Sequence, residues 1–308
     1  MSVIDIDTSN YTTSIAYFDG EGGVNCSRLL PVKPGELGLR QSDAVFAHTK
    51  SLPDLSGRLF SNADMGNITA VGVSTRPRAV EGSYMPCFMV GYSHAKLLSD
   101  ALGVPLIEVS HQQGHVAASL WSAGHLELME EPHLAWHLSG GTTELLLVEP
   151  EGLNVKCTKI GGTTDISAGQ LIDRTGVMLD LPFPAGKHID ALSKEATMKE
   201  TFKVKCPGME FSLSGVQNKV QQFHQKNGVP GETAAFALRC VAGAVYQATQ
   251  NALKAYPGLK VVFSGGVASN SMLREVIAPL NPIFCAPQYS TDNAMGVAVL
   301  TYRITREG

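Results

Sequence analysis

The chain opens on VIDIDTSNYTTSIAYF, residues 3–18, and this stretch indicates how the first part of the molecule folds. Residues 3–7 predict a β-strand, because apolar and β-branched residues dominate them. A short polar segment, residues 8–13, predicts a turn. Residues 14–18 predict a second strand, which Asp19-Gly20 closes. We therefore expect the chain to begin with a β-hairpin that has a polar turn.

The same pattern recurs near the middle of the chain. Leu134-Ala135-Trp136-His137-Leu138 predicts a strand and Ser139-Gly140-Gly141-Thr142-Thr143 a turn. Residues 144–149 predict the returning strand. This approximate repeat indicates two related halves.

Each half also contains a strand of the buried type that leads into a helix. In the first half, residues 70–74 precede a helical stretch near residues 88–102. In the second half, residues 261–264 precede a Gly-Gly turn and a helix from about Ser271. Hairpins combined with βα units predict an α/β fold of two related lobes with a ligand cleft between them. We place the lobes at residues 1–120 and 121–308.

Composition excludes several classes of protein. The chain has 308 residues, of which 44% are hydrophobic and 17% charged, with a formal net charge of -4. That charge argues against binding nucleic acid by bulk electrostatics alone, although a local basic groove remains compatible with it. No apolar run approaches the roughly 20 residues of a membrane helix. The six cysteines are scattered without a Cys-x-x-Cys pair, which is typical of reduced thiols in a cytoplasmic protein.

A pair of histidines gives the clearest metal signal. His111 and His115 are four residues apart, so on a helix both imidazoles lie on one face. Two such imidazoles suit zinc or iron and need at least one further ligand. Asp292, which precedes a helix of small residues, is a candidate carboxylate from far along the chain. No Glu follows His111, so the base of a zinc protease is missing. The alternative is a chance surface pair.

Glycine turns and acidic residues suggest a nucleotide site. The Ser139–Thr142 turn and the Gly265-Gly266 turn allow a backbone to approach an anion closely. Asp5 and Asp7 could hold a magnesium ion through water, as ATP sites often require. Asp173 and Asp190 are suited to accept ribose hydroxyls. The simpler alternatives are ordinary tight turns for the glycines, and helix capping or ordinary surface charge for Asp173 and Asp190.

Taken in order, these motifs resemble the TsaD family of tRNA threonylcarbamoyladenosine synthase subunits, over almost the whole chain. Eight segments carry the resemblance: Ile6-Asp7-Thr8-Ser9, residues 109–115, residues 138–142, residues 168–173, residues 181–186, residues 211–215, residues 265–271 and Thr291-Asp292-Asn293-Ala294. Their number and order make the resemblance specific.

The resemblance implies an ASKHA fold, the fold of actin, sugar kinases and Hsp70. It implies one iron or zinc ion on His111, His115 and Asp292, and ATP or threonylcarbamoyl-AMP as the bound nucleotide. It also implies transfer of the threonylcarbamoyl group to N6 of the adenosine beside the tRNA anticodon, companion proteins of that pathway, and a possible homo- or hetero-oligomer. The nucleotide contacts that it implies, together with the second glycine turn, are Leu138, Ser139, Gly140, Gly141, Thr142, Asp173, Gly186, Asp190, Gly265, Gly266 and Asn270.

The sequence departs from the family pattern at four places, all outside the metal set. Tyr11 and Thr12 stand where the family has two acidic residues, and Thr142 stands where it has a histidine. Residues 75–78 replace a Gly-Pro-Gly loop, and residues 184–187 alter a Pro-Gly-Gly-Pro segment. Two alternatives therefore stay open beside tRNA modification. One is a nucleotide-binding scaffold without turnover, and the other is a carbamoyltransferase that acts on a small molecule.

Overall fold

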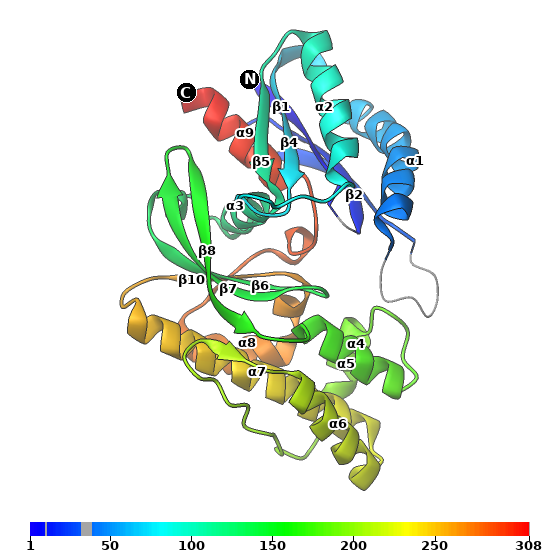
Figure 1. Cartoon of the computed structure of the whole chain (residues 1–308), viewed down its shortest axis with the longest axis vertical. Helices are drawn as coiled ribbons and strands as arrows, with labels where there is room; N and C mark the ends of the chain where they lie inside the picture. Colours follow the sequence, from blue (N-terminus) through cyan, green and yellow to red (C-terminus); the bar gives the residue numbers. More distant parts are fainter. Residues whose placement is uncertain (10, 32–38, 308) are drawn as a thin grey trace. The chain divides into compact units, whose positions relative to one another are not determined.

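The computed structural model describes residues 1–9, 11–31 and 39–307, which form two compact units (Figure 1). The first unit comprises Met1–Glu131, Glu149–Cys157 and Asp292–Gly308. The second unit comprises Pro132–Val148 and Thr158–Thr291.

The first unit is built on a five-stranded sheet in the order β3-β2-β1-β4-β5. β1 pairs antiparallel with β2 and parallel with β4, while β2 pairs antiparallel with β3 and β4 parallel with β5. The strands are β1 (Ser2–Asp7), β2 (Thr12–Phe18), β3 (Gly23–Leu29), β4 (Ile68–Arg76) and β5 (Leu106–Ser110). The helices are α1 (Gln41–Phe60), α2 (Phe88–Leu102), α3 (His111–Ala123) and α9 (Met295–Glu307), with 3-10 turns at Met65–Asn67 and Leu126–Glu130.

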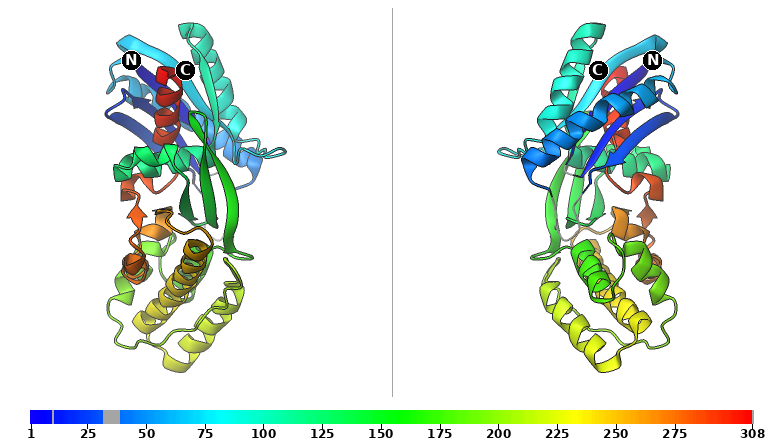
Figure 2. Two further views of the ribbon diagram at one scale, coloured as in Figure 1. Left: turned by 90° about the vertical axis from the view of Figure 1, so that its left-hand side faces the viewer. Right: turned by 90° about the vertical axis from the view of Figure 1, so that its right-hand side faces the viewer.

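Every residue of β1 is buried, because helices cover both faces of the sheet (Figure 2). Successive side chains of a strand point to opposite faces. Ile4 and Ile6 therefore pack into the apolar cluster under α1 and α2. Asp5 and Asp7 point to the other face, where Asp5 meets Thr301 of α9 and Asp7 meets His111 of α3. The alternation of the opening sequence thus puts two acids on one face of a buried strand.

The second unit is built on a six-stranded sheet in the order β11-β10-β6-β7-β8-β9. Its core gathers Trp136, Phe211 and Phe263 of the sheet with Phe223 and Phe236 of the long helices. The strands are β6 (His133–Leu138), β7 (Thr143–Glu151), β8 (Asn154–Thr163), β9 (Glu210–Phe211), β10 (Val261–Ser264) and β11 (Ile283–Phe284). The helices are α4 (Ala168–Met178), α5 (Gly186–Ser193), α6 (Ser214–Asn227), α7 (Pro230–Ala255) and α8 (Ser271–Ile277), with 3-10 turns at Gly266–Ser269, Ala278–Leu280 and Pro287–Tyr289.

The two sheets share one strand order, which confirms the internal repeat. β8-β7-β6-β10-β11 in the second unit corresponds to β3-β2-β1-β4-β5 in the first. In both units the hairpin pair is antiparallel, and the strand before the helix pairs in parallel with the first strand of the hairpin. The expected α/β architecture of two related lobes is therefore present.

The unit boundaries differ from the consecutive segments 1–120 and 121–308. α9, at the end of the chain, packs on β1, β2 and β4, so it belongs to the first unit. The tip of the β7–β8 hairpin also belongs there, because Gln113 Nε2 donates to Val155 O at 2.8 Å. The sequence pattern does not predict that α9 and the tip of the β7–β8 hairpin return to the first unit. These returns depend on which surface of the folded protein buries each segment. Among the described helices, none combines the length and hydrophobicity required of a membrane-spanning segment.

Candidate functional site

The start of α3 fixes the position of both histidines. Ser110 Oγ accepts from the Gln113 backbone N–H, and Gln113 Oε1 accepts from the Ser110 N–H at 2.9 Å. This reciprocal pair, a capping box, satisfies two backbone groups and sets the first helical residue. His111 therefore begins the helix, and His115 lies one turn further along the same face.

Close packing of α3 against α9 brings the third residue to this pair. Asp292 lies in the loop that leads into α9, three residues before the first helical residue, Met295. A Cβ built on Gly296 would lie only 1.8 Å from the Gly114 carbonyl oxygen, so the two helix backbones are in direct contact. Asn293 Oδ1 also accepts from the Met295 N–H at 3.1 Å, which orients the entry to the helix.

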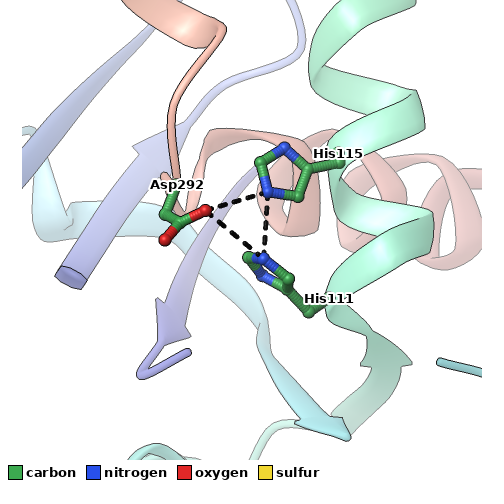
Figure 3. A group of neighbouring side chains, drawn as sticks. All are labelled: His111, His115 and Asp292. Atoms are coloured by element: carbon green, nitrogen blue, oxygen red, sulfur yellow. Dashed lines mark hydrogen bonds and ion pairs between the residues drawn. The ribbon is translucent and has the colours of Figure 1, made fainter. Parts of the chain in front are cut away.

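His111, His115 and Asp292 converge on one point (Figure 3). The Nε2 atoms of the two imidazoles are 2.9 Å apart. Asp292 Oδ1 lies 3.1 Å from His115 Nε2 and 3.5 Å from His111 Nε2. The structure thus brings together the three residues that the sequence proposed as a metal set, although His115 and Asp292 are 177 residues apart in the chain.

The donor set fits a divalent transition metal. Zinc binds imidazole nitrogen and carboxylate oxygen at about 2.0–2.2 Å. A triangle of donor atoms with edges near 3 Å can be reached from one point by bonds of that length. The side chain of His115 is 4% exposed, that of His111 17% and that of Asp292 25%. The centre is therefore largely buried and opens on the side of Asp292 and His111, where a further ligand could enter.

The electrostatics of the cluster favour positive charge. Burial acts to lower the pKa of His111, but Asp7 and Asp292 outweigh it and raise that pKa to about 10. Burial acts to raise the pKa of Asp292, and its bonds to His111 and His115 lower it far below the usual range. Two carboxylates around two imidazoles therefore favour a positive charge at this buried site, which either a proton on His111 or a metal ion can supply.

The paired carboxylates of β1 have different surroundings. Asp5 is fully buried, and its Oδ1 accepts from Thr301 Oγ1 at 2.5 Å. Burial, opposed by that hydrogen bond, raises the pKa of Asp5 well above its usual value, which favours the neutral acid. Asp7 instead bonds His111 Nδ1. Asp5 is thus an interior residue, and Asp7 belongs to the histidine cluster.

The Ser139–Thr142 turn of the second unit rests on the N-terminus of α4. Ser139 Oγ accepts from the Thr142 N–H at 3.1 Å, and Ser167 Oγ donates to Gly140 O at 2.5 Å. A Cβ on Gly169 would lie 2.4 Å from Gly140 Cα, so the turn and the helix are in close contact. Helix N-termini carry a partial positive charge and suit phosphate groups.

The glycines of this unit divide into two kinds. Gly265 has φ +89°, and a Cβ there would lie 2.1 Å from Leu138 O. Both the backbone conformation and the close packing therefore require glycine at this position. Gly140, Gly141, Gly186 and Gly266 have open space where a Cβ would stand. The protein's own packing does not require glycine at these four positions, and the space beside them is compatible with close approach of a ligand. Leu138 itself is buried in the core.

The polar candidates of this unit all hold helix termini. Asp173 accepts from the Ala185 N–H at 2.8 Å, next to Gly186. Asp190 accepts from the Ser271 N–H at 2.9 Å and from its hydroxyl at 2.8 Å. Asn270 Oδ1 caps α8 through the Leu273 N–H at 3.0 Å. These contacts link α4, α5 and α8 into one group, and for Asp173 and Asp190 they match the helix capping that the sequence left as an alternative.

Sequence reasoning missed the partner of His111 and the Gly114–Gly296 contact. The capping box Ser-x-x-Gln at residues 110–113 was a readable signal for the helix start. The pairing of Asp7 with His111 had no such signal, because it joins β1 to α3 across 104 residues.

Comparison with known proteins agrees with this architecture. The family model TsaD, described as tRNA N6-adenosine threonylcarbamoyltransferase, matches residues 37–299. The chain belongs to the TsaD family. A relative from Carboxydothermus hydrogenoformans, named tRNA N6-adenosine threonylcarbamoyltransferase, is 35% identical over 83% of this chain and 77% of its own length. As its relatives are named transferases, this TsaD-family chain is an enzyme of the transferase class.

Solved structures show that the TsaD chain has an ASKHA fold. Component A of (R)-2-hydroxyglutaryl-CoA dehydratase from Acidaminococcus fermentans superposes with a TM-score of 0.60 at 15% identity, covering all of both chains. A ROK family glucokinase from Streptomyces griseus, also covered completely, gives 0.55 at 10% identity. Identity this low supports the fold only.

The departures from the family pattern lie on both units. In the first unit, Thr12 is buried at the start of β2, and the adjacent Thr13 hydroxyl meets His48 Nδ1 at 2.8 Å. In the second unit, Thr142 closes the glycine turn and is half-buried. Asn10, which belongs to the altered segment after β1, lies outside the described residues.

Proposed function

We propose that this TsaD-family protein transfers a threonylcarbamoyl group from threonylcarbamoyl-AMP to N6 of the adenosine beside the anticodon of tRNA. The single observation that carries the proposal is the convergence of His111, His115 and Asp292, from two distant segments, in a chain of this family. In the reaction the amine N6 attacks the carbamoyl carbon, the bond to the AMP phosphate breaks, and N6 loses a proton.

The residues have separate roles in this proposal. His111, His115 and Asp292 would hold one zinc or iron ion, and a bound ion would supply a Lewis acid and an anchor for the activated carbamoyl group. The glycine turns at residues 139–142 and 265–266 would receive the adenylate phosphate, and Asp173, Gly186, Asp190 and Asn270 the nucleoside. AMP is a good leaving group, so the transfer needs no protein nucleophile.

The chemistry of the His111, His115 and Asp292 cluster supports a metal-binding role rather than a role for His111 as a general base. A general base must have a lone pair free near the reacting proton. Asp7 and Asp292 hold His111 toward its charged form, so it is a poor base at neutral pH. The same carboxylates make the cluster a good host for a cation.

The direct test is reconstitution of the tRNA modification. The purified protein is incubated with threonine, bicarbonate, ATP, the companion activating enzyme and tRNA, and nucleosides from the digested tRNA are analysed by mass spectrometry. We expect threonylcarbamoyladenosine with the wild-type protein and a loss of about 100-fold or more with His115→Ala or Asp292→Asn. The Carboxydothermus hydrogenoformans relative serves as the positive control. Absence of product beside a working control would refute the tRNA assignment.

A second candidate follows from Tyr11, Thr12 and Thr142, which stand at positions where the family pattern is acidic or histidine. These changes favour an altered acceptor, so that a carbamoyl group passes to a small molecule, or a scaffold that binds nucleotide without turnover. Calorimetry with ADP, together with an assay of carbamoyl-phosphate consumption, separates the two. Nucleotide binding without consumption of any carbamoyl donor would favour the scaffold.

A further inference from the structure

Asp7 joins β1 to the histidine cluster through its contact with His111, and its side chain is almost completely buried. It ends β1, and its side chain is 2% exposed. Asp7 Oδ2 lies 2.7 Å from His111 Nδ1, on the side of the ring away from Asp292. It is therefore outside the set of three ligand atoms and touches one of the ligands.

Both oxygens of Asp7 are held. While Oδ2 faces His111, Oδ1 accepts from the Ser9 N–H at 2.7 Å. The carboxylate therefore cannot rotate without losing a buried hydrogen bond. Because the carboxylate is held in this way, its contact with Nδ1 also orients the ring of His111.

The contact also determines which nitrogen of His111 is available. An ionised carboxylate only accepts hydrogen bonds, so His111 Nδ1 must carry the hydrogen in this pair. Nε2 then keeps its lone pair in the neutral ring, and Nε2 is the atom that faces His115 and Asp292. The opposite tautomer would put a hydrogen at the centre of the cluster.

Charge gives a second reason for an acid at this position. A divalent ion with two neutral imidazoles and Asp292 keeps one excess positive charge. Asp7 adds the second negative charge within one imidazole of the site. The buried assembly is then neutral, which low-dielectric surroundings favour.

On the basis of the metal centre proposed above, we infer that Asp7 is a positioning residue that holds His111 for ligation through Nε2 and sets the affinity for the cation. Carboxylates that bond the second nitrogen of a ligating histidine typically contribute 10–100-fold to metal affinity. Asp7 contacts neither the cation nor the substrate in this assignment.

The test is metal titration of three proteins: wild type, Asp7→Asn and Asp5→Asn. Asp5 is a matched control, because it is a buried acid on the same face of the same strand and bonds Thr301 instead of a histidine. Chelator-stripped protein is titrated with Co²⁺, followed by its visible absorption, and with Zn²⁺ in competition with a chromophoric chelator. We expect Asp7→Asn to weaken the binding of both ions about 10–100-fold and to alter the Co²⁺ spectrum. Asp5→Asn should bind both ions with wild-type affinity.

The outcomes separate this inference from the proposed function. If Asp7→Asn binds Co²⁺ and Zn²⁺ with wild-type affinity and spectrum, the positioning role is wrong and the metal centre stands. If the wild type takes up no stoichiometric ion, both fail together. If both Asp variants lose affinity equally, the effect is general damage to the fold and the specific role is wrong.

A measurement on the wild type covers the case in which Asp7→Asn does not fold. Long-range ¹H–¹⁵N spectra of the Zn²⁺-loaded protein distinguish the two ring nitrogens of each histidine. We expect His111 to keep a hydrogen on Nδ1 and to bind Zn²⁺ through Nε2. Coordination of His111 through Nδ1 would overturn the inference, because Asp7 could not then accept a hydrogen bond from that atom.

Discussion

Gly296 of α9 packs directly on the main chain of Gly114 of α3, with no side chain between the two helices. Gly114 lies between His111 and His115, and Gly296 lies four residues after Asp292. The contact therefore determines how near the carboxylate comes to the two imidazoles. It joins the packing of the first unit to the geometry of the candidate metal centre.

Gly296→Ala is expected to separate α3 from α9. The new Cβ would lie 1.8 Å from Gly114 O, so the helices must shift. We expect a loss of about 1–3 kcal/mol in the free energy of unfolding and a drop of about tenfold in Zn²⁺ affinity. Gly57→Ala in α1 is the control, because its Cβ meets open space, and it should gain about 0.5–1 kcal/mol. Urea unfolding and Zn²⁺ competition check both. Unchanged Zn²⁺ affinity in Gly296→Ala would show that the contact does not set the site.

His48 makes the stability of the first unit depend on pH. It is buried in α1 with Nδ1 against Thr13, and no partner for Nε2 is found in the described part of the chain. Burial, opposed by the charge of Asp7, lowers the pKa of His48 to about 4. Because the unfolded value is about 6.5, the unfolded chain binds a proton that the folded chain excludes. Stability is therefore full above pH 6.5 and falls as the pH drops toward 4.

Comparison of wild type with His48→Gln isolates this effect. We expect the wild type to lose about 1–2 kcal/mol more than the variant between pH 7.5 and pH 5, measured by urea unfolding at constant ionic strength. Gln is neutral at both pH values, so acidic groups common to both proteins cancel. Equal losses in the two proteins would mean that His48 is charged in the folded state.

Two substitutions of Asn270 can distinguish a role in helix capping from a role in ligand binding. Asn270→Ala removes the cap of α8 and should cost about 1 kcal/mol, whereas Asn270→Ser retains a capping oxygen. If Asn270 also contacts the adenylate, Asn270→Ser should unfold near the wild-type denaturant midpoint yet bind ADP more weakly in calorimetry. Wild-type affinity in Asn270→Ser would leave Asn270 with the capping role alone.

The glycine turn offers a similar contrast. In Gly141→Ala the new methyl group would occupy open space, so the stability of the protein should be unchanged. The same methyl group would obstruct a phosphate bound at this turn and should therefore weaken ADP binding. Gly169→Ala should destabilise the second unit by about 1–3 kcal/mol, because its Cβ would lie 2.4 Å from Gly140 Cα. Thermal unfolding and calorimetry measure the two effects. Normal ADP affinity in Gly141→Ala would argue against a phosphate at this turn.

Local patterns in the sequence were enough to predict the repeated hairpins and the helical face shared by His111 and His115. Residues 3–7 and 134–138 become β1 and β6, and the predicted helix at 88–102 is α2 (Phe88–Leu102). These features depend on residues within a few positions of one another, where periodicity and turn chemistry act. The motifs also indicated Asp292 as the third metal ligand. A carboxylate can be recognised as a candidate ligand from the sequence, even when the residues around it in the fold are unknown.

Only the tertiary structure decided how distant residues meet. The return of α9 to the first sheet, the Gly114–Gly296 contact and the bond from Asp7 to His111 each join segments more than 100 residues apart. Asp5 and Asp7 look alike in sequence, yet one bonds a threonine inside the core and the other a histidine of the cluster. The physical reason is that burial of apolar surface chooses which helices cover a sheet. The partners of each buried carboxylate follow from that choice, and the order of residues along the chain does not encode it locally.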